Sequence, residues 1–175
     1  MSDPASTPPT EGDFLGGSAA PFPVTHDGKT WLIGAPTLGA RDALNKFVVV
    51  HAMGTARQAD INTPGLGVFD QFKADHGQRK YQPGRSRWRE WVTGEDSNAL
   101  FLASLLYQHH PKEACVELAE TLIREKPDEV GIAMAEVIPG FFDLLAADKS
   151  LPPELREGFR AGATVLRSRS KPPGS

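Results

Sequence analysis

The hydrophobic pattern is strongest in the second half of the chain, where apolar residues recur at helical spacing. In Ala99–Gln108, eight of ten residues are apolar or aromatic, a pattern typical of a buried central helix. Pro111–Lys126 carries one apolar stripe opposite an acidic face and predicts an amphipathic helix. That stripe consists of Ala114, Cys115, Leu118, Ala119, Leu122 and Ile123. The same spacing restarts at Pro127, and we expect Pro139-Gly140 to end this third helix.

A last helix is predicted over residues 150–167, with Ser150 as its N-cap. Its apolar positions lie along one side and are Leu151, Leu155, Phe159, Gly162 and Leu166. Two glycines, Gly158 and Gly162, weaken a helix by roughly 1 kcal/mol each relative to alanine. We therefore expect this helix to depend on packing against the rest of the domain or a partner.

The first half of the chain predicts a β-hairpin followed by one helix. Asp27-Gly28 is a preferred type I′ turn pair between two short apolar runs, and Pro23 marks an edge strand. Thr37 is the expected N-cap of a helix whose buried face consists of Ala40, Leu44, Phe47, Val48 and His51. The β-branched run Val48–Val50 leaves an extended strand open as an alternative.

From Gly54 to Gly94 no hydrophobic period is sustained, so an irregular insertion is predicted, with short helical turns at Val68–Lys73 and Ser86–Val92. Residues 1–20 and 168–175 are rich in Ser, Pro and Gly, and we expect them to be disordered. The predicted fold is mostly α: an N-terminal β-hairpin and a small helical bundle in a single domain over residues 21–149, with the C-terminal helix beyond it.

Composition points to a protein of a reducing compartment. The net charge is −3 and the chain has one cysteine, so no internal disulfide forms. The N-terminus has no apolar core of a signal peptide, and no uninterrupted run of about 18 apolar residues occurs. We expect a cytoplasmic protein without membrane segments, and a homo-oligomer is compatible with the sequence.

Candidate catalytic and metal-binding residues do not assemble into a motif. His109, His110, Cys115 and His51 lack the spacing of a closed zinc site. Cys115 falls on an apolar stripe between acidic neighbours, where a cysteine behaves as a small hydrophobe. We expect no enzyme activity, no metal and no cofactor.

One basic segment interleaves cations with aromatic residues, a combination typical of single-strand nucleic-acid binding. Its cations are Arg79, Lys80, Arg85, Arg87 and Arg89. The alternative is a basic loop that pairs with the acidic stretch Lys112–Asp148, which has three basic and nine acidic residues. In that case Trp88 and Trp91 anchor the loop or contact a protein partner. We favour a protein partner over nucleic acid.

Four bulky apolar residues follow the Pro139-Gly140 pair: Phe141, Phe142, Leu144 and Leu145. They either close the core of the helical domain or form a surface that receives the helix of a partner. The sequence leaves both interpretations open.

Three segments together resemble phage tail assembly chaperones. They are the hairpin and helix "FPVTHDGKTWLIGAPTLGARDALNKF", the apolar helix "NALFLASLLYQHHP" and the paired helices "EACVELAETLIREKPDEVGIAMAEVIPGFF". The resemblance covers about residues 22–142, without the stretch 54–94. It implies a non-enzymatic protein of phage or prophage origin that acts in the host cytoplasm and holds the long, helix-forming tape-measure protein. The six expected contact residues are Phe141, Phe142, Leu144, Leu145, Trp88 and Trp91.

Overall fold

The computed structural model describes residues 20–170, which form two short strands followed by seven helices. They are β1 (Phe22–His26), β2 (Lys29–Ile33), α1 (Leu38–Asn62), α2 (Val68–Gly77), α3 (Ser86–Thr93), α4 (Ser97–Tyr107), α5 (Val116–Glu125), α6 (Pro127–Ala147) and α7 (Pro153–Ser170). The predicted mostly α fold with an N-terminal hairpin is confirmed. Disorder was predicted for residues 1–20 and 168–175, of which 1–19 and 171–175 lie outside the described residues. The prediction is wrong for 168–170, which are the last residues of α7.

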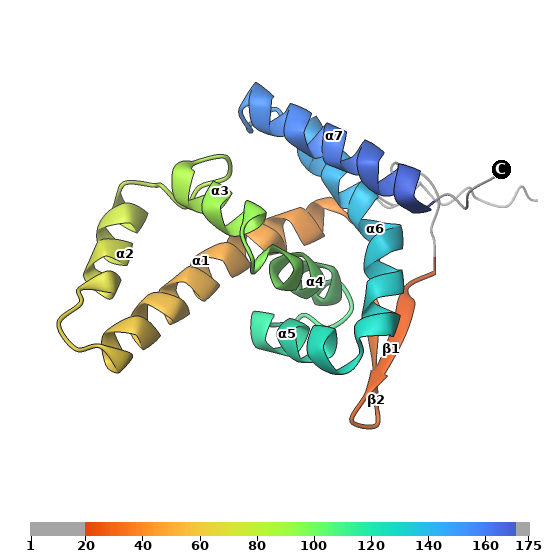
Figure 1. Cartoon of the computed structure of the whole chain (residues 1–175), viewed down its shortest axis with the longest axis horizontal. Helices are drawn as coiled ribbons and strands as arrows, with labels where there is room; N and C mark the ends of the chain where they lie inside the picture. The colour runs from red at the N-terminus through yellow and green to blue at the C-terminus, as the bar shows by residue number, and fades with distance from the viewer. Residues whose placement is uncertain (1–19, 171–175) are drawn as a thin grey trace, which may run out of the picture.

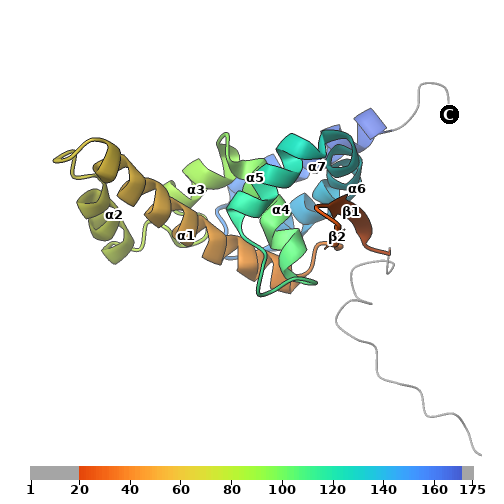
Figure 2. The same ribbon diagram turned by 90° about the horizontal axis from the view of Figure 1, so that it is seen from below.

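The helices are arranged around α4, whose apolar residues are buried on nearly all sides as predicted. α1 runs across the molecule beside α4, and α2 packs on the end of α1 that lies far from the hairpin (Figure 1). α5 covers another side of α4, while α6 and α7 form an adjacent antiparallel pair (Figures 1 and 2). One continuous core of buried apolar side chains results.

The hairpin forms as the turn chemistry predicts. Asp27 and Gly28 both have positive φ, 48° and 71°, the conformation of a type I′ turn. Val24 pairs with Trp31 across the ladder, and Val24 and Ile33 are fully buried against the helices. A two-stranded hairpin is marginal alone in water, so α4 and α6 supply the surface that stabilises it.

α1 begins where predicted but continues past Gly54. The Thr37 side chain accepts a hydrogen bond from the Ala40 backbone N–H at 3.2 Å, which confirms the N-cap. The alternative strand at Val48–Val50 is wrong, because this run lies within the helix. Ala52 and Ala56 extend the buried face by one further turn each, and this burial carries the helix to Asn62.

The predicted irregular insertion is also wrong, because most of residues 54–94 are helical. The Asp60 carboxylate near the end of α1 accepts hydrogen bonds from the Val68 and Phe69 backbone N–H groups, both at 2.9 Å. A side chain from one helix thereby caps the next, and its negative charge stabilises the N-terminus of α2. The two short helical turns that were predicted correspond to α2 and α3.

α6 continues through Pro139, contrary to the predicted break. The proline removes one backbone hydrogen bond and costs about 3 kcal/mol in a helix interior. Phe141 and Leu145 after the proline are 0% and 1% exposed, and burying each large apolar side chain contributes about 1.5–3 kcal/mol. Burial along one continuous face therefore offsets the cost of the proline.

Smaller boundary corrections concern α5 and α7. Pro111 does not open α5, because residues 111–113 form a turn and Cys115 is the N-cap of a helix that starts at Val116. Ser150 is not the cap of α7, which begins at Pro153. The Ser150 backbone N–H and hydroxyl instead donate to Asp148 Oδ1, at 2.9 and 2.6 Å. α7 packs along α6, which supplies the packing that we expected a helix weakened by Gly158 and Gly162 to need.

Candidate functional site

Three of the four bulky residues in α6 belong to the core. Phe141, Leu144 and Leu145 are 0%, 7% and 1% exposed. The Phe141 ring packs edge-on against Phe101 of α4, with 5.1 Å between ring centroids. Of the two interpretations left open by the sequence, the core applies to these residues, and they cannot contact a partner while the domain is folded.

The two tryptophans proposed as contacts are also buried, Trp88 fully and Trp91 in part. Trp88 of α3 is fully buried, and its indole N–H donates to Asn45 Oδ1 of α1 at 2.9 Å. Trp91 is partly buried and packs edge-on against His51, with 5.2 Å between ring centroids. Trp88 therefore anchors α3 as the alternative interpretation held, but on α1 and not on the acidic stretch Lys112–Asp148, and it is unavailable to a partner.

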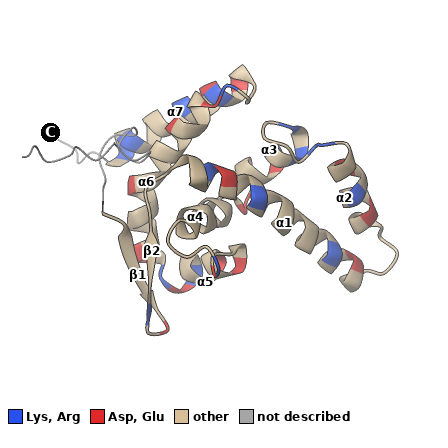
Figure 3. Cartoon of the chain, turned by 180° about the vertical axis from the view of Figure 1, so that it is seen from behind, with Lys and Arg blue, Asp and Glu red and all other residues tan. Residues whose placement is uncertain are grey.

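Phe142 is the exception among the predicted contacts, because it lines an apolar groove. We call this surface the apolar groove: it measures about 650 Å³ and lies between α5, α6 and α7, with the start of α4 at one end. Its lining residues are Asn98, Ile123, Pro127, Val130, Gly131, Met134, Ala135, Ile138, Phe142, Gly162, Val165 and Leu166. Every one of them except Asn98 is apolar or glycine. α6, which supplies most of the lining, carries acidic residues (Figure 3), but none of its four carboxylates lines the groove.

The groove is closed on one side where α7 packs against α6, at Phe142 and Gly162. Phe142 lies between Phe101 of α4 and Phe159 of α7, at centroid distances of 5.7 and 5.4 Å. A Cβ atom at Gly162 would approach the Phe142 ring to 3.0 Å, so glycine permits the close approach of the two helices. Val165, one turn further along α7, remains 48% exposed at the groove. The groove therefore presents apolar side chains that this domain leaves in contact with water.

The basic segment is partly neutralised by one buried carboxylate. Asp75 of α2 is 1% exposed, and its Oδ1 accepts from Lys80 Nζ at 2.7 Å and from Gln71 Nε2 at 2.9 Å. Its Oδ2 accepts from Arg87 Nε at 2.7 Å. These bonds, led by that from Lys80, lower the pKa of Asp75 from 3.8 to about 2. The expected pairing with Lys112–Asp148 is wrong for these two cations, because their main partner lies on α2.

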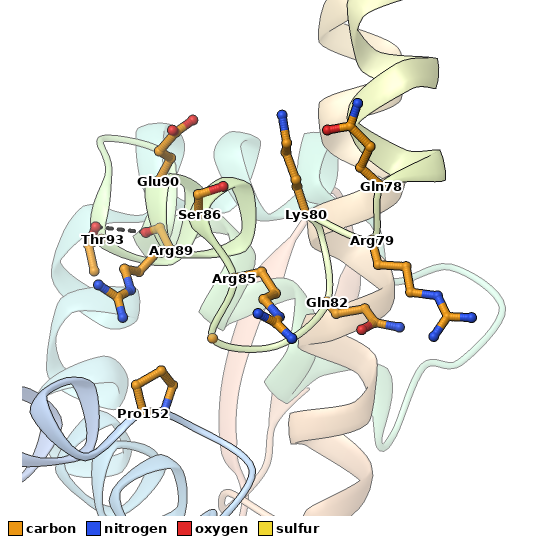
Figure 4. Close-up of a pocket in the computed structure, with 11 residues that line it drawn as sticks. Gln78, Arg79, Lys80, Gln82, Arg85, Ser86, Arg89, Glu90, Thr93 and Pro152 are labelled. Carbon is orange, nitrogen blue, oxygen red and sulfur yellow. Dashed lines mark hydrogen bonds between the residues drawn. The ribbon is translucent and has the colours of Figure 1, made fainter.

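The other predicted cations face solvent beside an open pocket (Figure 4). Arg79, Lys80, Arg85 and Arg89 line this pocket of about 920 Å³, whereas Arg87 does not. Within residues 20–170, Arg79 and Arg85 form no ion pair, and Arg89 lies 3.7 Å from Glu154 of α7. Figure 4 shows Arg85 and Arg89 on the side of the pocket that faces Pro152. The basic segment thus retains exposed cations.

Cys115 and His110, two of the candidate residues of the sequence, lie in environments that disfavour reactivity. Burial raises the pKa of the Cys115 thiol, which lowers its thiolate fraction. His110 accepts a hydrogen bond from the Leu32 backbone N–H at 3.0 Å, and burial lowers the pKa of its imidazole. Its ring packs against Trp31, so His110 serves to hold the hairpin on the end of α4.

Sequence reasoning missed one convergence of ionisable side chains. His51 of α1 lies near Asp96, which directly precedes α4, and Glu120 of α5, with one ligand atom of each residue within 4.8 Å of the others. The three are separated by 45 and 24 positions in the chain, so no short motif could have revealed them. The sequence did place His51 on the buried face of the first helix, but it did not indicate its two neighbours.

One described helix, α6, is long and apolar enough to cross a membrane by length and composition alone, and half of its most apolar stretch is buried. A core helix of a soluble protein satisfies the same criterion, so this is weak evidence for a membrane segment. No protein-family model, no curated protein and no solved structure matches this chain.

Proposed function

We propose that this chain is a non-enzymatic binding protein that holds an amphipathic helix of a protein partner in the apolar groove. The observation that carries the proposal is the apolar groove itself, an open surface of about 650 Å³ lined by apolar side chains of α5, α6 and α7. A helix binds such a surface by inserting the apolar residues of one face, spaced at i, i+3, i+4 and i+7. Met134 in the lining is flexible and adapts to different side chains.

Together with the resemblance of three segments to phage tail assembly chaperones, this surface favours a role in tail assembly. The partner in that role is a tape-measure protein, whose long helices expose apolar faces before assembly. A holder of such helices has to cover these faces reversibly. An open groove on a stable domain serves this purpose better than an enclosed cavity.

Coexpression with a long helix-forming protein encoded beside this chain tests the proposal. We expect the partner to remain soluble and to copurify with the unaltered chain. Val165→Asp, which places a charge in the groove at a side chain 48% exposed, is expected to abolish copurification. Ile61→Asp is the matched control, because Ile61 is 70% exposed at the end of α1 and does not line the groove. Equal copurification of the two variants would refute the groove as the binding site.

A second candidate function is nucleic-acid binding by the basic segment, favoured by the four cations around the open pocket. Arg79, Arg85 and Arg89 are the ones not held by Asp75. Three phosphate contacts predict that the logarithm of affinity for single-stranded DNA falls with the logarithm of salt with a slope of about −2. Absence of binding at about 50 mM salt would exclude this function and leave the first proposal unaffected.

A further inference from the structure

The convergence of His51, Asp96 and Glu120 joins three separate parts of the fold. His51 projects from the middle of α1, Asp96 precedes α4, and Glu120 lies on the exposed side of α5. The His51 Nε2 and Asp96 Oδ2 atoms are 3.4 Å apart, and all three ligand atoms fall within 4.8 Å. The His51 side chain is 14% exposed and is held in place by the edge-on contact with Trp91.

The Asp96 side chain pairs with His51 rather than with the end of its own helix, at 3.4 Å between Oδ2 and Nε2. Asp96 occupies the N-cap position of α4, yet its side chain makes no capping hydrogen bond. Its carboxylate faces His51 and Glu120 instead. Within residues 20–170 neither Asp96 nor Glu120 forms an ion pair with a lysine or arginine. Two carboxylates this close repel each other, and a cation between them removes the repulsion.

We propose that His51, Asp96 and Glu120 bind one divalent transition-metal ion of the Zn²⁺ type. Imidazole nitrogen and carboxylate oxygen are both ligands for such ions, at about 2.0–2.2 Å. Two ligands of a tetrahedral ion at these distances are about 3.3 Å apart, close to the 3.4 Å between His51 Nε2 and Asp96 Oδ2. Glu120 is exposed, so a rotation of its side chain would bring the third ligand atom from within 4.8 Å to bonding distance. The two carboxylates neutralise the charge of the ion. The remaining coordination position is left to water.

Calorimetric titration of the full chain with Zn²⁺, after treatment with a chelator, tests this site. We expect one ion per chain and at least a tenfold loss of affinity in Glu120→Gln and in His51→Gln. Glu117→Gln and His76→Gln are the matched controls, because both residues are exposed and lie outside the cluster. These controls are expected to retain the full affinity. Since Glu120 is exposed, its variant remains informative if His51→Gln fails to fold.

Co²⁺ provides a readout of position. The Trp91 ring lies 5.2 Å from the His51 ring, so a paramagnetic ion at this site is expected to quench the fluorescence of Trp91. In Trp91→Phe the quenching is expected to weaken, because only Trp31 and Trp88 still contribute to the signal, while calorimetric binding of Co²⁺ persists. The proposal is overturned if Zn²⁺ does not bind in a saturable manner up to 1 mM, or if Glu120→Gln binds as tightly as Glu117→Gln.

Discussion

Replacement of Phe141 by alanine tests whether this residue belongs to the core. The side chain is 0% exposed and packs edge-on against Phe101, with 5.1 Å between ring centroids. Truncation removes buried apolar area and leaves a cavity, which together cost about 3–5 kcal/mol. The aromatic pair supplies about 0.5–1.5 kcal/mol of that sum. Because the free energy of unfolding of a domain is about 5–15 kcal/mol, the loss is large.

Urea unfolding followed by tryptophan fluorescence measures this loss as a free energy, and thermal unfolding measures it as a change in melting temperature. At about 2–4 °C per kcal/mol for a chain of this size, the melting temperature of Phe141→Ala is expected to fall by about 6–20 °C. Ile132→Ala on the same helix is the control, because Ile132 is 65% exposed, and its effect is expected to stay within about 0.5 kcal/mol. A cost of less than about 1 kcal/mol for Phe141→Ala, or a cost equal to that of the control, would refute the core assignment.

Three further predictions concern contacts that order residues 54–94. Because the pKa of Asp75 falls from 3.8 in the unfolded chain to about 2 in the fold, its charge stabilises the protein fully above about pH 4 and progressively less as the pH falls toward 2. Asp75→Asn is therefore expected to be less stable than the unaltered chain in urea titrations at pH 7, with a difference that shrinks between pH 4 and 2; a constant difference would contradict this. Trp88→Phe removes the 2.9 Å hydrogen bond to Asn45 and is expected to cost about 1–2 kcal/mol in the same titration, whereas an unchanged midpoint would show that the bond does not hold α3. Gly84→Ala places a Cβ 2.6 Å from Pro152 Cδ at a φ of +78° and is expected to lower the free energy of unfolding by more than about 1 kcal/mol, and a stabilised variant would exclude this contact.

Elements governed by local chemistry could be predicted from the sequence. The positive φ values demanded by a type I′ turn suit Asp27-Gly28, and Thr37 caps the helix that follows it. The central helix α4 was evident from its nearly continuous apolar composition. In each case the deciding interactions lie within a few residues of one another in the chain.

Elements stabilised by distant contacts were not predictable in this way. The order of residues 54–94 depends on Asp60 and Asp75, whose roles as cap and as ion-pair partner follow only from the packing of α1, α2 and α3. Similarly, Pro139 stays helical because its neighbours are buried on both sides.

The candidate site was predicted only in part. Phe141 and Phe142 are adjacent, and on a helix adjacent side chains point about 100° apart. One of them therefore enters the core and the other lines the apolar groove. The hydrophobicity of both residues was plain in the sequence, but the position of α7, which decides between the two environments, was not.

The central claim is that the apolar groove binds a helix of a protein partner. The most direct measurement is the dissociation constant for a purified helical segment of the proposed tape-measure partner, determined by calorimetry for Val165→Asp and Ile61→Asp. The two variants add the same charge at exposed apolar positions, inside and outside the groove. The account predicts at least tenfold weaker binding by Val165→Asp and unchanged binding by Ile61→Asp. Equal affinities, with helical content intact by circular dichroism, would contradict it.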